Sequence, residues 1–205
     1  MPATPLVLAS SSPYRRELLS RLGIPFEHAS PDIDESPHPN ESAQRLTVRL
    51  AAEKARALAS QFPNHWIIGS DQVATLADGS ILTKPGTHEL ASDQLARCSG
   101  QTVRFMTGLA LLDSTDGQLA TLCEPFEVQF RTLSDGDIEH YLRTDTPYDC
   151  AGSFRMEGLG IALFSGLAGR DPNSLIGLPL IGLCELLRAW GLDPLEAAYR
   201  NSNRD

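Results

Sequence analysis

The stretch from residue 6 to residue 23 constrains the fold more than any other part of the chain. It begins with the apolar run Leu6–Ala9, which predicts a buried strand because loop residues bound it. Ser12 then predicts a helix N-cap, and Pro13 suits the first helical position, where its missing N–H group costs nothing. Gly23 predicts the end of that helix. We therefore expect a strand, a tight polar loop and a helix in direct succession.

This helix start also predicts an anion-binding site. Unpaired backbone N–H groups and the positive end of the helix dipole point the same way there. Tyr14, Arg15 and Arg16 occupy the first turn, where acidic residues are normally preferred, so a bound phosphate would offset the positive charge. The alternative is that Ser10 to Ser12 form only a turn and a cap and that the arginines are solvated. The stretch alone leaves both interpretations open.

The composition is that of a folded protein without a general affinity for polyanions. The 205 residues, 41% apolar and 21% charged, suit one medium-sized domain or two small lobes. A formal charge of −9 argues against binding to nucleic acid or to an anionic membrane surface. The four cysteines form no C-x-x-C pair, so reduced thiols rather than zinc ligands are expected. No signal peptide or membrane-spanning stretch is recognisable, and we expect a cytoplasmic protein.

Periodicity and turn signals predict one compact α/β unit, with a hairpin-bearing second lobe as an alternative. The segment 24–40 is rich in proline and acid and is expected to be irregular and exposed. The segment 149–160 is expected to form a loop or irregular strand, and the chain from Tyr199 a frayed polar tail. Regular elements are expected at 42–62, 89–98, 138–143 and 179–190 for helices, and at 66–69, 73–76, 80–83, 103–112, 119–130 and 161–164 for strands.

Lys54 lies on the apolar face of the helix predicted at 42–62. A lysine on such a face either extends past its neighbours to water or projects into a cleft and meets an anion. Glu53 and Arg56 flank it and could have carried the surface charge instead, which favours the cleft.

Carboxylates and a second lysine complete a candidate site. Asp71 follows the apolar strand predicted at 66–69, where α/β sheets place ligand-contacting groups, although it could also cap the next element. The turn signal at residues 78–79 predicts a hairpin that returns Lys84 to the neighbourhood of Asp71. In the acidic segment, Glu35 belongs either to a solvated loop or to a divalent cation site, for which Mg²⁺ is the first choice.

These residue types suit phosphoanhydride hydrolysis, in which bases neutralise a polyphosphate while carboxylates hold a metal and orient water. The set comprises Ser10, Arg15, Lys54, Lys84, Asp71 and Glu35. No P-loop, dinucleotide-binding or nucleophile-elbow motif occurs in the chain. The residues by themselves support a nucleotide or phosphate-ester hydrolase.

Seven segments, in unbroken order, resemble the Maf family of nucleotide pyrophosphatases. They are LASSSPYRRELL at 8–19, DIDE at 32–35, LAAEKA at 50–55, IGSDQV at 68–73, KP at 84–85, AGSFRMEG at 151–158 and IGLP at 176–179. The pattern is similar to the YceF-type subgroup, whose members hydrolyse 7-methyl-GTP to the monophosphate and pyrophosphate. Three positions carry this distinction: Tyr14, Gln72 and Glu157 stand where members that prefer pyrimidine triphosphates carry Arg, Thr and Gln. An aromatic ring and a carboxylate suit a cationic methylated guanine.

The resemblance also implies roles for the candidate residues. Asp71 would be the base that activates water for attack on the α-phosphorus, and Glu35 would join it in holding Mg²⁺ or Mn²⁺. The triphosphate would be held by Ser10, Arg15, Lys54 and Lys84. The implied fold is a single elongated α/β unit over residues 1–199, with a mixed β-sheet, flanking helices and two lobes around a central cleft, followed by a polar tail at 200–205.

The resemblance implies homodimers as well. It leaves two alternatives to a 7-methyl-GTP pyrophosphatase. One is a nucleotide-responsive regulator of septum formation with weak or broad hydrolysis. The other is a housekeeping hydrolase of damaged standard triphosphates.

Overall fold

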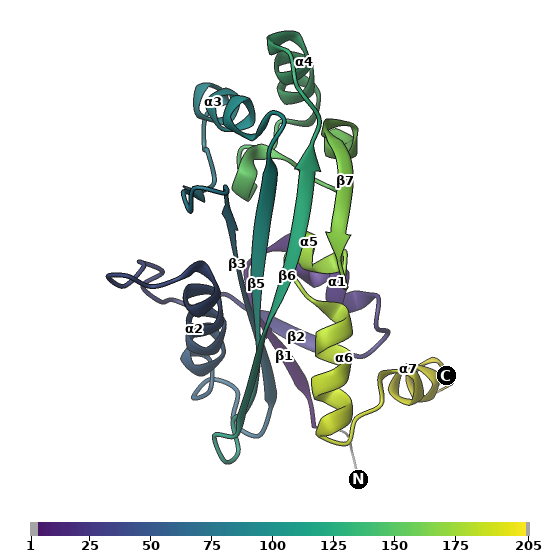
Figure 1. The fold of residues 1–205 in the computed structure, drawn as a ribbon. Coiled ribbons are helices and arrows are strands. Elements are labelled where there is room, and N and C mark those ends of the chain that lie inside the picture. The colour runs from purple at the N-terminus through teal and green to yellow at the C-terminus, as the bar shows by residue number, and fades with distance from the viewer. Residues whose placement is uncertain (1–3, 204–205) are drawn as a thin grey trace. The chain divides into compact units, whose positions relative to one another are not determined.

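The computed structural model describes residues 4–203, which form strands, α-helices and two 3-10 helices (Figure 1). The strands are β1 (Leu6–Ala9), β2 (Phe26–Ala29), β3 (Trp66–Thr75), β4 (Ile81–Leu82), β5 (Thr102–Asp113), β6 (Leu119–Phe130) and β7 (Phe164–Gly169). The α-helices are α1 (Pro13–Ser20), α2 (Ala43–Ala57), α3 (His88–Cys98), α4 (Asp135–Asp145), α5 (Asn173–Ile176), α6 (Leu180–Ala189) and α7 (Pro194–Ser202). The 3-10 helices are η1 (Ala151–Ser153) and η2 (Leu159–Leu163).

The strands form a mixed sheet with helices around it, as the sequence predicts. Their order is β2-β1-β3-β5-β6-β7, and β4 pairs with β3. Strand β1 runs parallel to both β2 and β3, with Leu6 opposite Phe26 on one side and Trp66 on the other. Strand β4 is antiparallel to β3, and β7 is antiparallel to β6. Parallel neighbours need crossover connections, which α1 and α2 provide for the first three strands.

The chain divides into two compact units, and neither is continuous in sequence. Unit 1 comprises Met1–Asp71, Thr107–Glu124 and Gly177–Asp205, and unit 2 comprises Gln72–Met106 and Pro125–Ile176. Strands β3, β5 and β6 each supply residues to both units. The predicted hairpin at residues 78–79 exists and lies in unit 2, where Ala74 of β3 faces Leu82 of β4.

In unit 1, the core lies between α2 and the strands, and glycines let the helix approach them closely. Small residues of α2, among them Ala51 and Ala55, pack with apolar residues of β1, β3 and β5. A Cβ atom on Gly69 of β3 would lie 2.0 Å from the carbonyl oxygen of Ala51, and one on Gly108 of β5 would lie 2.1 Å from that of Thr47. Since real Cβ contacts are never that short, glycine is required at both positions.

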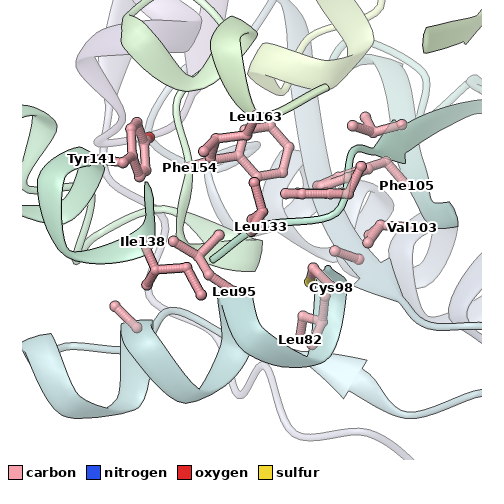
Figure 2. Close-up of a cluster of buried hydrophobic side chains, with 14 of the residues drawn as sticks. Leu82, Leu95, Cys98, Val103, Phe105, Leu133, Ile138, Tyr141, Phe154 and Leu163 are labelled. Carbon is pink, nitrogen blue, oxygen red and sulfur yellow. The ribbon is translucent and has the colours of Figure 1, made fainter. Parts of the chain in front are cut away.

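Unit 2 has a separate core, in which α3 and α4 pack side by side against strand residues (Figures 1 and 2). Leu95 and Cys98 from α3 meet Ile138 and Tyr141 from α4, and the cluster extends to aromatic residues including Phe154. Helix α4 begins with a capping box formed by Ser134 and Asp137.

Several local predictions are confirmed and others are wrong. The strand at Leu6–Ala9 and the helix that begins at Pro13 with Ser12 as its N-cap are present as predicted. The segment 24–40 is not wholly irregular, because Phe26–Ala29 forms β2 beside β1. The helix predicted at 42–62 ends at Ala57.

The remaining corrections concern the extent of strands and the C-terminal region. Strand β3 does not end before Asp71 but continues to Thr75, so Asp71 lies within the strand. Residues 161–163, predicted as strand, belong to η2, and β7 starts at Phe164. Helix α7, capped by Asp193, continues through Ser202 where a frayed tail is predicted. Across residues 4–203, no helix combines the length and the apolar character that crossing a bilayer requires.

Candidate active site

A buried ion pair between Lys54 and Asp71 is the centre of the candidate site in unit 1. The Nζ atom of Lys54 lies 2.6 Å from Oδ1 of Asp71, and the two side chains are only 8% and 10% exposed. Strand alternation places Gly69 and Asp71 on the same face of β3, the face that α2 covers. The close approach of α2 at Gly69 therefore brings Lys54 of this helix within reach of Asp71.

The same lysine contacts a second carboxylate. Oε1 of Glu35 lies 2.7 Å from Nζ of Lys54, although the Glu35 side chain is 60% exposed. One ammonium group thus bridges a buried and an exposed carboxylate. The alternative in which Lys54 extends to water is wrong, because the residue is buried.

Arg15 adds a second cation to this cluster. Burial lowers the pKa of its guanidinium, while the negative charges of Asp71 and Glu35 oppose that shift. Its Nε atom donates to the carbonyl oxygen of Gly177 at 2.7 Å, which orients the side chain. With Lys54 and Arg15 against Asp71 and Glu35, the four groups carry two positive and two negative formal charges. The cluster itself is therefore electrically balanced.

Ser70 lies on the other face of β3 and contacts Gly177, and neither residue is predicted from the sequence to belong to the site. The buried Ser70 hydroxyl lies 2.8 Å from the Gly177 carbonyl oxygen and 2.9 Å from that of Gly108, and it can donate to either. Gly177 has φ +118°, and a Cβ atom there would lie 3.2 Å from Nε of Arg15. The signal in the sequence is the Gly-Leu-Pro run, which predicts special backbone geometry.

Ser10 and Tyr14 lie at the start of α1, as predicted. Ser10 is buried, and its Oγ accepts the backbone N–H of Ser12 at 3.1 Å. The Ser12 hydroxyl in turn accepts the N–H of Arg15. Tyr14 is half-buried in the first turn. The two serines thus bind two of the backbone donors at this helix start, in keeping with the cap interpretation, while the anion-site interpretation stays a prediction.

Lys84 and Glu157 belong to unit 2, and both are exposed. Lys84 lies between β4 and α3, and Glu157 lies between η1 and η2. The predicted proximity of Lys84 and Asp71 stays a prediction.

Gln72, the first residue of unit 2, holds α5 through its side chain. Its Nε2 atom donates to the carbonyl oxygens of Ser174 and Leu175, at 2.7 Å and 3.1 Å. Its amide nitrogen therefore donates to main-chain acceptors, a structural role that is not predicted from the sequence.

Arg155 fixes the segment that precedes Glu157. Its guanidinium donates to the main-chain carbonyl of Asp145 and pairs with the Asp145 carboxylate at 3.2 Å. Its backbone N–H donates to the Tyr141 hydroxyl at 3.0 Å. Burial raises the pKa of Tyr141, so the phenol is neutral at physiological pH. This segment is therefore attached to α4 at two points.

Glu35 and Asp71 are the candidate oxygen donors for a cation. Both carboxylates approach the single Nζ atom of Lys54, so they converge on one region. Within residues 4–203, no cluster of three or more His, Cys, Asp or Glu residues arranged to hold a metal is found. Two carboxylates fit a hard cation that takes its other ligands from phosphate oxygens and water.

Comparison with known proteins identifies a matching family model and a similar enzyme. Residues 5–190 match the family model described as Maf-like protein. A 7-methyl-GTP pyrophosphatase from Nitrosococcus oceani is 58% identical over 191 residues, which cover 93% of this chain and 96% of that protein. A crystal structure of a nucleoside-triphosphatase / dITP/XTP pyrophosphatase from Mycobacterium abscessus is 15% identical, with a TM-score of 0.44, over 91% of this chain and 96% of that one.

Proposed function

The chain belongs to the Maf family, and we propose that it hydrolyses 7-methyl-GTP to 7-methyl-GMP and pyrophosphate. The 58% identical relative is named a 7-methyl-GTP pyrophosphatase, which supports the choice of substrate. The observation that carries the chemistry is the buried Lys54–Asp71 pair, with Glu35 on the same ammonium. A buried carboxylate held in place by a lysine is a suitable general base when substrate brings a water molecule to it.

In this proposal, Asp71 accepts a proton from the water that attacks the α-phosphorus. The water oxygen forms the new bond to the α-phosphorus, and the bond from that phosphorus to the bridging oxygen breaks. Pyrophosphate leaves with the electron pair. Ser10, Arg15, Lys54 and Lys84 hold the triphosphate through hydrogen bonds and positive charge, which stabilise the charge that develops on the phosphoryl oxygens.

A divalent cation, Mg²⁺ or Mn²⁺, is part of the proposal. The charge balance of the site argues for it, because a triphosphate adds several negative charges to a cluster that is already neutral. Glu35 and Asp71 would hold the ion, which supplies Lewis-acid stabilisation of the phosphate oxygens when bound. The exposed position of Glu35 suits a ligand that meets an ion arriving with the nucleotide.

Base selection is assigned to Tyr14, Gln72 and Glu157. The Tyr14 ring suits stacking on a cationic methylated guanine, and the exposed Glu157 carboxylate suits accepting from guanine N–H groups. For Gln72, whose Nε2 donates to α5, we propose that the Oε1 atom takes part.

A nucleotide panel tests this function. Purified protein with Mg²⁺ is given 7-methyl-GTP, GTP, dTTP and UTP, and released pyrophosphate and orthophosphate are measured separately. We expect pyrophosphate with 7-methyl-GTP as the preferred substrate. Preference for an unmodified triphosphate would support the housekeeping hydrolase instead, and orthophosphate release would contradict the proposed bond cleavage.

The regulator of septum formation is not favoured, since the similar protein bears the name of an enzyme and Glu35, Lys54 and Asp71 are brought together here. We also propose a cytoplasmic location, where nucleotides are metabolised, and a homodimer without nucleic-acid or membrane partners. The formal charge of −9 supports the last point.

A further inference from the structure

We propose that Gln94 is a positioning residue that links the two unit 2 segments carrying Lys84 and Glu157. This inference rests on the proposed function, which gives Lys84 a triphosphate-holding role and Glu157 a base-selecting role. Gln94 is a half-buried residue of α3 that occurs in none of the segments resembling the Maf family.

The nitrogen and the oxygen of the Gln94 side-chain amide each form a hydrogen bond, and the two bonds reach different segments. Its Nε2 atom donates to the carbonyl oxygen of Thr83 at 3.0 Å. Its Oε1 atom accepts the hydroxyl of Ser153 at 2.9 Å. A side chain that both donates and accepts is required here, because Thr83 offers an acceptor and Ser153 offers a donor.

The first contact fixes the connector that bears Lys84. Thr83 immediately precedes Lys84, and at the other end of the connector the N–H of Gly86 donates to the carbonyl of Tyr148 at 2.9 Å. Pro85, between them, is buried and has a restricted φ. Lys84 is thus an exposed residue on a segment whose backbone is held on both sides.

The second contact fixes the segment that leads to Glu157. Ser153 is fully buried and has φ +62°, an uncommon conformation for a residue with a side chain. Its N–H donates to the carbonyl of Cys150 at 3.1 Å, and its hydroxyl has Gln94 as its partner. A buried hydroxyl held in strained backbone indicates that this turn depends on that partner.

Each of the three polar residues is next to a residue of the same hydrophobic core. Leu82, Leu95 and Phe154 are adjacent in sequence to Thr83, Gln94 and Ser153, and all three side chains lie in the cluster shown in Figure 2. The core therefore sets the distance between the two segments. At the edge of that core, the two hydrogen bonds of Gln94 fix the position of one segment relative to the other.

Three variants separate the two links. Gln94→Glu keeps the acceptor for Ser153 but loses the donor for Thr83. Ser153→Ala removes the hydrogen bond to Gln94 Oε1 but keeps the one from Gln94 Nε2 to Thr83. Gln94→Met removes both hydrogen bonds with little change of size. Asp93→Asn, an exposed neighbour on α3, is the matched control. Thermal unfolding of each variant establishes that it folds; should Gln94→Met fail to fold, the two single-link variants carry the test.

The readout is KM and kcat for 7-methyl-GTP and GTP with Mg²⁺. A lost hydrogen bond of ordinary strength changes an equilibrium by roughly twofold to tenfold. We expect Gln94→Glu to raise KM for both nucleotides by about fivefold with selectivity unchanged, because uniform binding is lost. We expect Ser153→Ala to lower the selectivity for 7-methyl-GTP over GTP by about fivefold, and Gln94→Met to show both effects.

Two results would overturn the inference while the wild-type enzyme hydrolyses 7-methyl-GTP normally. One is a Gln94→Met protein within twofold of wild type in KM and selectivity. The other is an equal loss of kcat in all three variants without either effect, which would indicate general loosening. Absence of wild-type turnover on the whole nucleotide panel would overturn the proposed function and this inference together.

Discussion

Asp71 is the residue on which the proposed chemistry depends, and its surroundings make a specific substitution informative. Its Oδ1 atom lies 2.6 Å from Nζ of Lys54, and the side chain is 10% exposed. Asp71→Asn keeps the size of the side chain and its ability to accept from Lys54, but the amide cannot accept a proton from water. We expect kcat to fall by about 10³-fold, in the range of lost general bases, while the protein stays folded.

Steady-state kinetics measures the change in kcat, and thermal unfolding shows whether the variant is folded. Asp32→Asn, an exposed residue of the acidic segment before α2, serves as the control and should retain activity. If Asp71→Asn kept more than a tenth of wild-type kcat, the base would have to be another group.

Tyr14 and Glu157 together are expected to define the preferred base. Tyr14→Arg combined with Glu157→Gln introduces the residues expected at these positions in Maf proteins that prefer pyrimidine triphosphates. We expect the ratio of kcat/KM for 7-methyl-GTP over UTP to fall by at least tenfold, because stacking and a carboxylate acceptor are both lost. Unchanged preference for 7-methyl-GTP in the double variant would show that other residues select the base.

Glu41 gives a pH-dependent contribution to stability. Hydrogen bonds from Arg49 and from the backbone of His38 lower its pKa from 4.5 to about 2. A lowered folded-state pKa stabilises the fold fully above the unfolded value of 4.5, and this contribution is lost as the pH falls toward 2. We expect the urea midpoint of wild type to exceed that of Glu41→Gln at pH 6.

This difference should shrink as the pH is lowered from 4.5 and vanish only once the pH has fallen below the folded-state pKa of about 2. Equilibrium unfolding of both proteins at several pH values provides the measurement. A difference that is equally large at both ends of the pH range would mean that Glu41 acts through packing rather than through its charge.

At the scale of elements, the contact of α2 with the sheet determines where Lys54 lies. A Cβ atom on Gly69 would lie 2.0 Å from the Ala51 carbonyl oxygen, so Gly69→Ala forces α2 away from β3. We expect a loss of about 1–3 kcal/mol in unfolding free energy, the usual effect of overpacking, together with a larger loss of kcat as Lys54 moves from Asp71.

Gly136→Ala is the matched control for that substitution. Gly136 lies in α4, and the nearest atom to its added Cβ is Oγ of Ser134 at an ordinary 3.8 Å. Since alanine favours helix over glycine, this change should stabilise the protein by roughly 0.5–1 kcal/mol and leave activity intact. Urea unfolding compares the two variants, and equal effects from both would contradict the close-packing argument.

Elements that depend on neighbouring residues could be predicted from the sequence, and those that depend on distant partners could not. The Ser12 cap, Pro13 and the capping box at Ser134 are local signals, and the structure has all three. Strand β2, by contrast, exists through its parallel pairing with β1, and its half-exposed FEHA sequence has no strong strand signal of its own. The hairpin of β3 and β4 has a local turn signal and was predicted, whereas the continuity of β3 through Asp71 was not.

The same distinction applies to the candidate site. Lys54 was predictable because a charged residue interrupts an apolar helix face, which is a local pattern. Its pairing with Asp71 and Glu35 was not, since it requires the close approach of α2 at Gly69. The contribution of Ser70 depends on Gly177, more than a hundred residues away in sequence.

At the scale of the whole molecule, the proposed substrate-binding residues are distributed over two units that share three strands. The boundary between the units falls between Asp71 and Gln72, so the proposed base ends one segment of unit 1. Lys84 and Glu157 belong to unit 2. Such discontinuous units leave no linker or composition change in the sequence, so their boundaries were not predicted, although two lobes were expected.

The most direct test of the account is hydrolysis of 7-methyl-GTP in ¹⁸O-labelled water, followed by mass spectrometry of both products. Attack of water on the α-phosphorus predicts one ¹⁸O atom in 7-methyl-GMP and none in pyrophosphate, with both products formed about 10³-fold more slowly by Asp71→Asn. Label in pyrophosphate, release of orthophosphate, or no turnover of 7-methyl-GTP by the wild-type protein would contradict it.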